Sequence, residues 1–91
     1  MVHRKFGFLN YAGILRHKGY RFFFWANEGN PREPLHIHIR KGGAVAKFWV
    51  LPEVRVAESY DMSPAELREL SKVVKDNKEL IEGKWNEFFP E

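Results

Sequence analysis

The sequence predicts a small α+β domain, an antiparallel β-meander of three to five strands with one long C-terminal helix packed on one face. Three observations support this prediction. Residues 35–40 alternate apolar and polar side chains, as a half-buried strand does. Lys41-Gly42-Gly43-Ala44 is typical of a two-residue hairpin turn. After residue 62 the apolar period changes from two to about 3.6, which indicates a helix covering the sheet.

The composition sets limits on the class of protein. The chain has 91 residues, 44% of them hydrophobic and 15% aromatic, so aromatic side chains should fill much of a single core. It has no cysteine, which excludes disulfides and thiolate metal sites. No apolar signal segment or membrane span is recognisable, so we expect a cytoplasmic protein. Residues 1–12 are predicted as an irregular or locally helical arm, and residues 13–91 as the domain.

The first two strands are expected around a turn at Lys18-Gly19, over residues 13–16 and 20–26. If Arg21 points outward, Phe22 and Phe24 face the core, although the opposite facing is open. In that arrangement the outward side chains are Arg21, Phe23 and Trp25. Residues 27–34 are predicted as a loop because they contain two prolines and a glycine.

Pairing Lys41 with Ala44 fixes the register of the central hairpin. The apolar pairs fall on one side: Ile39 with Ala46, Ile37 with Phe48 and Leu35 with Val50. The other side receives Arg40 with Val45, His38 with Lys47 and His36 with Trp49. A second turn at residues 51–53 would bring Val54 opposite Val50, Val56 opposite Phe48 and Arg55 beside Trp49. Both turns therefore agree on which side is the core.

The helix has a well-marked start. Ser63 is the expected N-cap, Pro64 the first helical residue, and Glu66 completes a capping box. We expect one helix from Pro64 to about Phe89, with a bend at Asn77 or Gly83 as the alternative. The apolar stripe facing the sheet is Leu67, Leu70, Val73, Val74, Leu80, Ile81, Trp85, Phe88 and Phe89.

The outer face of this sheet would combine cations with aromatic rings, and the net charge of the chain is +3. Such a face suits single-stranded nucleic acid, because rings stack on bases and cations meet phosphates. The residues predicted to bind nucleic acid are Arg21, Trp25, Arg40, Lys47, Trp49 and Arg55. The alternatives are a face that binds a protein partner or a second copy of the chain, and a face covered by the chain itself.

His36 and His38 share the outer face and admit three interpretations. They could act as general base and general acid in metal-independent RNA cleavage. They could bind a metal with a third ligand from Glu58, Asp61, His17 or His3, but no spacing is diagnostic, so we predict neither metal nor cofactor. They could also be structural strand residues, one against Trp49 and the other close to Lys47.

Several stretches resemble the small prokaryotic proteins of domain-of-unknown-function family 4160. They are residues 19–24, 27–30, 34–38, 46–49 and 85–89, and the most specific is the loop followed by Pro34-Leu35-His36-Ile37-His38. Leu35 stands where the family usually has a second proline. The resemblance runs from about Gly13 to the end and marks His36 and His38 as the functional motif. It implies a standalone domain, often encoded beside a small partner protein, as in toxin–antitoxin pairs.

Together these observations predict a nucleic-acid-interacting protein, with RNA as the expected ligand. The resemblance adds the role of a toxin in a two-gene pair. The residues themselves suggest His36 and His38 as the catalytic pair of a ribonuclease in that role. The alternative is a non-catalytic module that uses the aromatic sheet face to bind a small cognate protein or a second copy of itself.

Overall fold

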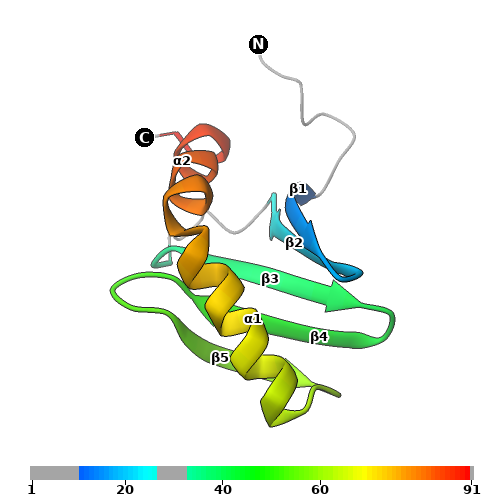
Figure 1. The fold of residues 1–91 in the computed structure, drawn as a ribbon. Coiled ribbons are helices and arrows are strands. Elements are labelled where there is room, and N and C mark those ends of the chain that lie inside the picture. Colours follow the sequence, from blue (N-terminus) through cyan, green and yellow to red (C-terminus); the bar gives the residue numbers. More distant parts are fainter. Residues whose placement is uncertain (1–10, 27–32, 91) are drawn as a thin grey trace.

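Five strands follow one another both along the chain and across the sheet in the computed structural model, which describes residues 11–26 and 33–90 (Figure 1). The strands are β1 (Tyr11–His17), β2 (Tyr20–Trp25), β3 (His36–Lys41), β4 (Ala44–Trp49) and β5 (Arg55–Tyr60). Two helices follow, α1 (Pro64–Asp76) and α2 (Lys78–Phe88), and lie against one face of the sheet. The predicted α+β meander is confirmed. Residues 1–12, which were predicted as an arm, lie largely outside the described residues. β1 begins at Tyr11, within the range predicted for the arm.

The predicted register of the central hairpin is confirmed pair by pair. His36 lies opposite Trp49, Ile37 opposite Phe48 and His38 opposite Lys47. Beyond the strand ends, the Val50 amide donates a hydrogen bond to the Leu35 carbonyl oxygen at 2.8 Å. The second turn also returns the chain as predicted, with Val56 opposite Phe48 and Arg55 opposite Trp49.

The core lies between the helices and the face of the sheet that alternation predicted. Phe22, Phe24 and Ile37 are fully buried there, which confirms the preferred facing of β2. The helices add Leu70, Val74, Ile81, Trp85 and Phe89 to the same cluster. Leu80 was predicted to belong to the apolar stripe but is 42% exposed. Val56 faces inward but lies on the edge strand β5 and is also 42% exposed.

The single long helix was a wrong prediction, because the chain forms two helices that meet at Asn77. The Asn77 side chain donates a hydrogen bond to the Val73 carbonyl oxygen at 2.8 Å, and its backbone leaves the helical region at φ −115° and ψ 21°. A side chain that bonds the backbone of the preceding turn competes with the helical ladder. Asn77 therefore ends α1, and α2 starts in a new direction that carries Trp85 to the sheet (Figure 1).

Polar contacts dock α1 onto the first hairpin. The predicted capping box is present, with Ser63 and Glu66 bonding each other's backbone amides. The Tyr20 hydroxyl donates a hydrogen bond to the Glu66 carboxylate, and this bond raises the pKa of Tyr20 to about 12. The pKa of Glu66 is lowered, first by the hydrogen bond from the Ser63 backbone amide and then by the bond from Tyr20. One turn further on, Glu69 contacts His17 at 2.8 Å and Lys18 at 3.0 Å, and both contacts lower its pKa.

Two β-bulges interrupt the regular alternation of the sheet. In β1, Gly13 pairs with Phe23 and Leu15 pairs with Phe22, so Ile14 is an extra residue. In β5, Glu58 pairs with Lys47 and Val56 pairs with Phe48, so Ala57 is an extra residue. Because side chains alternate with a period of two, the residues that follow an extra residue face the opposite side from the one they would face in a regular strand of the same sequence. The bulge in β1 thus turns Leu15 inward and Arg16 outward.

Candidate nucleic-acid interface

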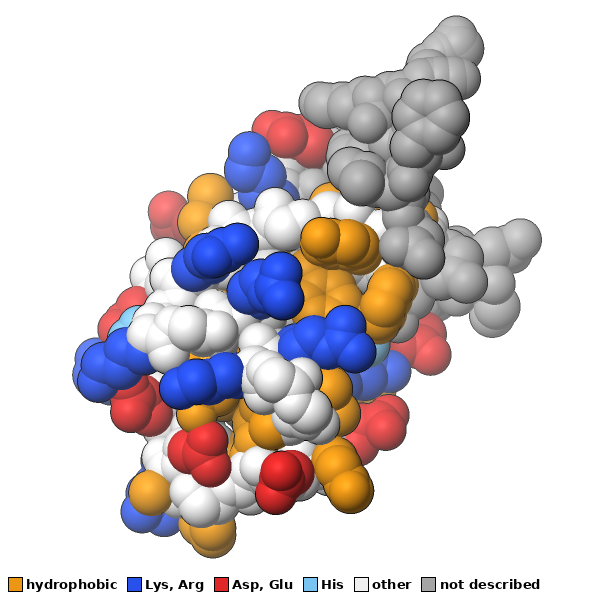
Figure 2. All heavy atoms as spheres, turned by 90° about the vertical axis from the view of Figure 1, so that its right-hand side faces the viewer, with side chains coloured by type: hydrophobic (Ala, Val, Ile, Leu, Met, Phe, Trp, Pro, Cys, Tyr) orange, Lys and Arg blue, Asp and Glu red, His pale blue; other side chains and the backbone are white. Residues whose placement is uncertain are grey.

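The outer face of the sheet, opposite the helices, carries cations and rings from all five strands. The register assigns the following side chains to it: Tyr11, Arg16, Arg21, Phe23, Trp25, His36, His38, Arg40, Val45, Lys47, Trp49, Arg55, Glu58 and Tyr60. Figure 2, which shows one side of the molecule, has basic side chains gathered beside a hydrophobic patch, with acidic side chains mostly toward the margins. This face has the composition that the sequence predicted.

Four rings form a continuous cluster on this face, which we call the ring cluster: Tyr11, Phe23, Trp25 and His38. Phe23 lies at its centre, with its centroid 5.6 Å from Tyr11 and 5.1 Å from Trp25 in edge-to-face arrangements. The His38 ring stacks on Phe23 with centroids 5.6 Å apart. Phe23 is thereby buried, whereas Tyr11 remains 40% exposed. The cluster holds its outer rings in fixed orientations that a base could stack on.

Arg16, Arg21 and Arg40 form a row across three neighbouring strands, which we call the arginine row. Arg16 lies opposite Arg21 in the β1–β2 pair, and Arg21 lies opposite Arg40 in the β2–β3 pair. All three are exposed. Within residues 11–26 and 33–90, no carboxylate forms an ion pair with any of them. The row is therefore a concentration of positive charge that the described part of the protein does not neutralise.

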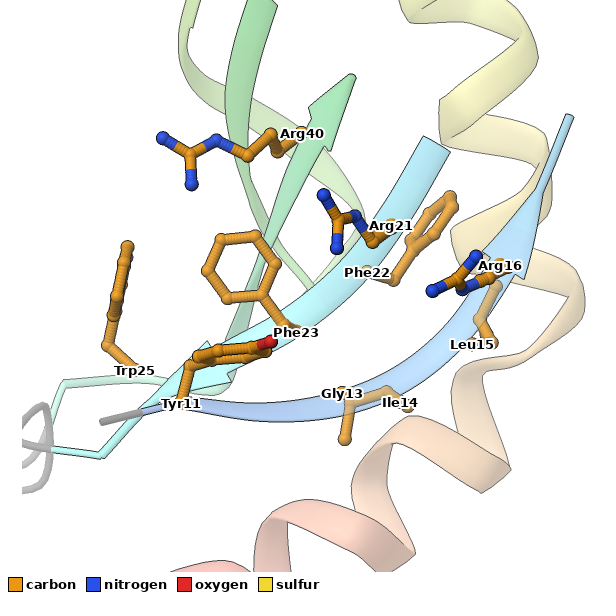
Figure 3. Close-up of a pocket in the computed structure, with 10 residues that line it drawn as sticks. All are labelled: Tyr11, Gly13, Ile14, Leu15, Arg16, Arg21, Phe22, Phe23, Trp25 and Arg40. Atoms are coloured by element: carbon orange, nitrogen blue, oxygen red, sulfur yellow. The ribbon is translucent and has the colours of Figure 1, made fainter. Parts of the chain in front are cut away.

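A hollow of about 590 Å³ connects the arginine row with the ring cluster (Figure 3). Its lining comes from β1, β2 and one residue of β3, and includes all three arginines together with Tyr11, Phe23 and Trp25. Gly13 lies on this lining, and a Cβ built on it would meet no atom within 4 Å. The hollow is open at this point because residue 13 has no side chain.

The cations of β4 and β5 are neutralised, in contrast to the arginine row. The Lys47 ammonium donates a hydrogen bond to Glu33 Oε1 at 3.0 Å and lies 4.6 Å from the centroid of the Trp49 ring. This bond lowers the pKa of Glu33. Lys47 also lies opposite Glu58, and Arg55 Nε is 3.6 Å from Glu53. A phosphate would have to compete with these carboxylates.

His36 is fully buried although strand alternation places it on the outer face. Its ring lies between Trp49 and Trp85, with centroids 5.7 and 5.3 Å away. β2 and β3 are paired only from Phe23 and His38 to Arg21 and Arg40, so His36 lies beyond the paired part of these strands. Nδ1 lies 2.9 Å from the Pro34 carbonyl oxygen, which can only accept, so Nδ1 carries a proton.

The two histidines predicted as a catalytic pair are close together but differ in access. Their ring centroids are 5.3 Å apart and the rings meet edge to face. A general acid or base must come within hydrogen-bond reach of its substrate. His38 is partly exposed on the ring cluster, whereas no part of His36 is accessible. This arrangement favours the structural interpretation of His36, and the ribonuclease activity stays a prediction. In the described residues, no group of three His, Asp or Glu side chains could hold a metal ion.

The structure divides the predicted binding residues into two groups. Arg21, Trp25 and Arg40 line the hollow, whereas Lys47, Trp49 and Arg55 lie outside it and are engaged with other side chains. Sequence reasoning missed Arg16 and Tyr11. Regular alternation from Tyr11 would have placed Arg16 on the core side, and only the glycine at position 13 hinted at a bulge.

The fold and this face define a class: small α+β proteins that present a cationic and aromatic sheet surface. The chain belongs to the family described as Domain of unknown function (DUF4160), whose family model matches residues 19–86. The match covers β2 to β5, α1 and most of α2, whereas β1, with Tyr11 and Arg16, lies outside it. Neither the curated proteins nor the solved structures contain a match to this chain. Among the described residues, no helix is long and apolar enough to span a membrane.

Proposed function

We propose that this protein binds single-stranded RNA through the outer face of its sheet. The observation that carries the proposal is the arginine row, three exposed guanidiniums that no described carboxylate neutralises, beside the ring cluster. Arginine forks form paired hydrogen bonds with phosphate oxygens. A base stacked on an aromatic side chain contributes about 1–3 kcal/mol and requires no particular sequence.

The arrangement favours a single strand over a duplex. Rings can stack only on bases that are unpaired and turned outward, which a helix of paired strands does not offer. Open sheets that display aromatic side chains and basic residues are a common way to bind single-stranded RNA. The preference for RNA over DNA rests on this analogy at the level of the fold.

The cellular setting of this activity follows from the family resemblance. We place it in the cytoplasm of a prokaryote, in the toxin of a two-gene pair whose second gene encodes a small partner protein. RNA binding alone is sufficient for such a role, because a protein that covers a transcript blocks its use. Cleavage would additionally require access to His36.

The proposal is tested by fluorescence anisotropy with a labelled single-stranded RNA, the same sequence as DNA, and the RNA duplex. We expect single-stranded RNA to bind with a Kd on the order of micromolar, and the duplex to bind more weakly. Arg21→Gln and Trp25→Ala should each weaken binding about tenfold, because one removes a phosphate contact and the other a stacking surface.

Arg68→Gln is the matched control, because Arg68 is an exposed arginine on α1 whose loss changes the net charge equally. It should leave the affinity unchanged. Absence of binding at low salt, or an equal loss with Arg68→Gln and Arg21→Gln, would contradict the proposal. Urea unfolding of each variant separates lost binding from lost folding.

A second candidate function is a protein-binding module, and the β4–β5 side of the outer face favours it. Val45 and Tyr60 lie opposite each other there, 39% and 69% exposed, beside the edge of the sheet. Light scattering of the purified protein over a range of concentrations tests self-association. A dimer that Tyr60→Lys disrupts while RNA binding persists would show that the face has two functions.

A further inference from the structure

We propose that the hollow over β1–β3 is a site for the terminal phosphate of a single-stranded nucleic acid, with the adjoining base against the ring cluster. This inference rests on the proposed function and assigns a specific ligand group to one part of the interface. A terminal phosphate is a monoester and carries between one and two negative charges near neutral pH. An internal phosphate in the strand is a diester and carries one.

The arrangement of charge in the arginine row fits the more negative group. Like charges placed directly opposite each other across strands destabilise a sheet. This sheet has two such pairs in succession, Arg16 with Arg21 and Arg21 with Arg40. A single dianion between them would neutralise most of the repulsion at once, which a monoanion would not.

The dimensions of the row allow all three arginines to contact one phosphate. Neighbouring strands are about 4.8 Å apart, so the outer two arginines of the row start roughly 10 Å from each other. Their long side chains can converge from both sides on a ligand above Arg21, each presenting paired N–H donors. Figure 3 shows the three guanidinium groups around the same hollow.

The ring cluster lies at the distance that one nucleotide requires. Phe23 follows Arg21 by two residues on the same face, which corresponds to about 7 Å along the strand. A nucleotide whose phosphate contacts Arg21 therefore places its base near the exposed ring of Tyr11 and the partly exposed ring of Trp25, both beside Phe23. The volume of about 590 Å³ is within the range of small-molecule sites.

Gly13 gives the hollow its open floor and offers a way to close it. A side chain at residue 13 would meet no backbone or side chain within 4 Å of its Cβ. Valine is moreover better suited to a strand than glycine. Gly13→Val should therefore fill part of the hollow without disturbing the sheet around it.

The experiment compares one short RNA sequence in three forms: with a 5′-phosphate, with a 3′-phosphate, and with hydroxyl groups at both ends. We expect at least one phosphorylated form to bind the wild-type protein about tenfold more tightly than the hydroxyl form, because the arginine row gains charge-assisted bonds. The two phosphorylated forms distinguish which end of the strand enters. Arg16→Gln and Gly13→Val should each reduce the preference to about twofold or less. Arg68→Gln should retain it in full.

The outcomes separate this inference from the proposed function. Equal affinity for all three RNA forms would overturn the terminal-phosphate site and leave RNA binding intact. A preference that survives both Arg16→Gln and Gly13→Val would place the phosphate elsewhere and overturn it as well. Absence of binding to all three forms would overturn both proposals. Urea unfolding tests whether each variant is folded. If Gly13→Val is unfolded, Arg16→Gln alone decides the outcome.

Discussion

The outer face of the sheet has an open end and a closed end, built from similar residues. At the open end, over β1–β3, the arginine row borders a hollow and has no carboxylate partner among the described residues. At the closed end, over β3–β5, the cation Lys47 is bonded to Glu33 and lies over Trp49. The histidine there, His36, is buried against Trp49 and Trp85.

This difference shows that residue type alone does not identify a binding surface. A cation that already has a carboxylate and a ring contributes to the stability of the protein and has less to offer a ligand. A cation without a partner contributes little to stability, and next to like charges it opposes folding. Substitutions at the closed end should therefore change the free energy of unfolding, and substitutions at the open end should change affinity.

The largest expected effect separates the two histidines. His36→Ala should lower the free energy of unfolding by about 2–4 kcal/mol, because it leaves a cavity between two tryptophans. His38→Ala should lower it by less than about 1 kcal/mol, since His38 is partly exposed. Urea unfolding measures both values. Similar losses in the two variants would contradict the distinction between a buried and an accessible histidine.

Charge reversal at the centre of the arginine row should affect binding and stability in opposite directions. We expect Arg21→Glu to weaken RNA binding about 100-fold, roughly 2.7 kcal/mol, because it replaces an attraction with a repulsion. It should also raise the stability of the protein by a few tenths of a kcal/mol, because Glu would then lie between two arginines. Anisotropy and urea unfolding check the two effects, and Arg55→Glu at the closed end serves as the comparison. If Arg55→Glu weakened binding as much, the open end would have no special role.

The dependence of affinity on salt gives a finer measure of which cations meet phosphates. For single strands, the slope of log affinity against log salt falls by about 0.7 for each phosphate contact that is lost. Arg21→Gln should reduce the slope by about this amount. Lys47→Gln should leave it unchanged while lowering stability, since Lys47 is bonded to Glu33. An equal change of slope in both variants would mean that RNA displaces Glu33.

The smallest effect is expected in acid and, of the two ends of this face, concerns only the closed end. The pKa of Glu33 is lowered from 4.5 by Lys47, so Glu33 stabilises the folded state above this value. The contribution is lost as the pH falls through the lowered pKa, because a protonated carboxyl no longer attracts the ammonium. Unfolding between about pH 6 and pH 3 should show this loss in the wild type and less of it in Glu33→Gln. The arginine row, with no such carboxylate, should add nothing to it.

The sequence was sufficient to predict the sheet wherever a short turn fixes the register. The hairpin at residues 41–44 determined which face each residue of β3 and β4 occupies, and the structure confirms these pairs. It was insufficient in β1, where the extra residue Ile14 exchanges the two faces and hides Arg16. Alternation assumes a regular strand, and one glycine does not say on which side of it a bulge will form.

The burial of His36 could not be predicted for a different reason. Alternation correctly assigns it to the side opposite Ile37, but burial depends on what covers that side. Trp49 and Trp85 both lie against the ring, and Trp85 comes from α2, beyond the end of α1 at Asn77. Asn77 was one of two expected bends, and nothing local distinguished a bend from a complete break. Contacts between distant elements decide such details, and propensity does not.

The extra residue in β1 also determines which changes of chain length this protein tolerates. Deleting Ile14 would remove the bulge and leave a regular strand in which Leu15 still lies opposite Phe22 and Arg16 still lies opposite Arg21, so neither side chain would change face. A strand that kept Ile14 but paired without the bulge would instead turn Arg16 toward the core and bury its charge. Lengthening the Lys18-Gly19 turn would leave the facing of the residues before it unchanged. Sequences that share this surface should accordingly vary in the length of that turn, and should either keep the extra residue together with its bulge or lack both.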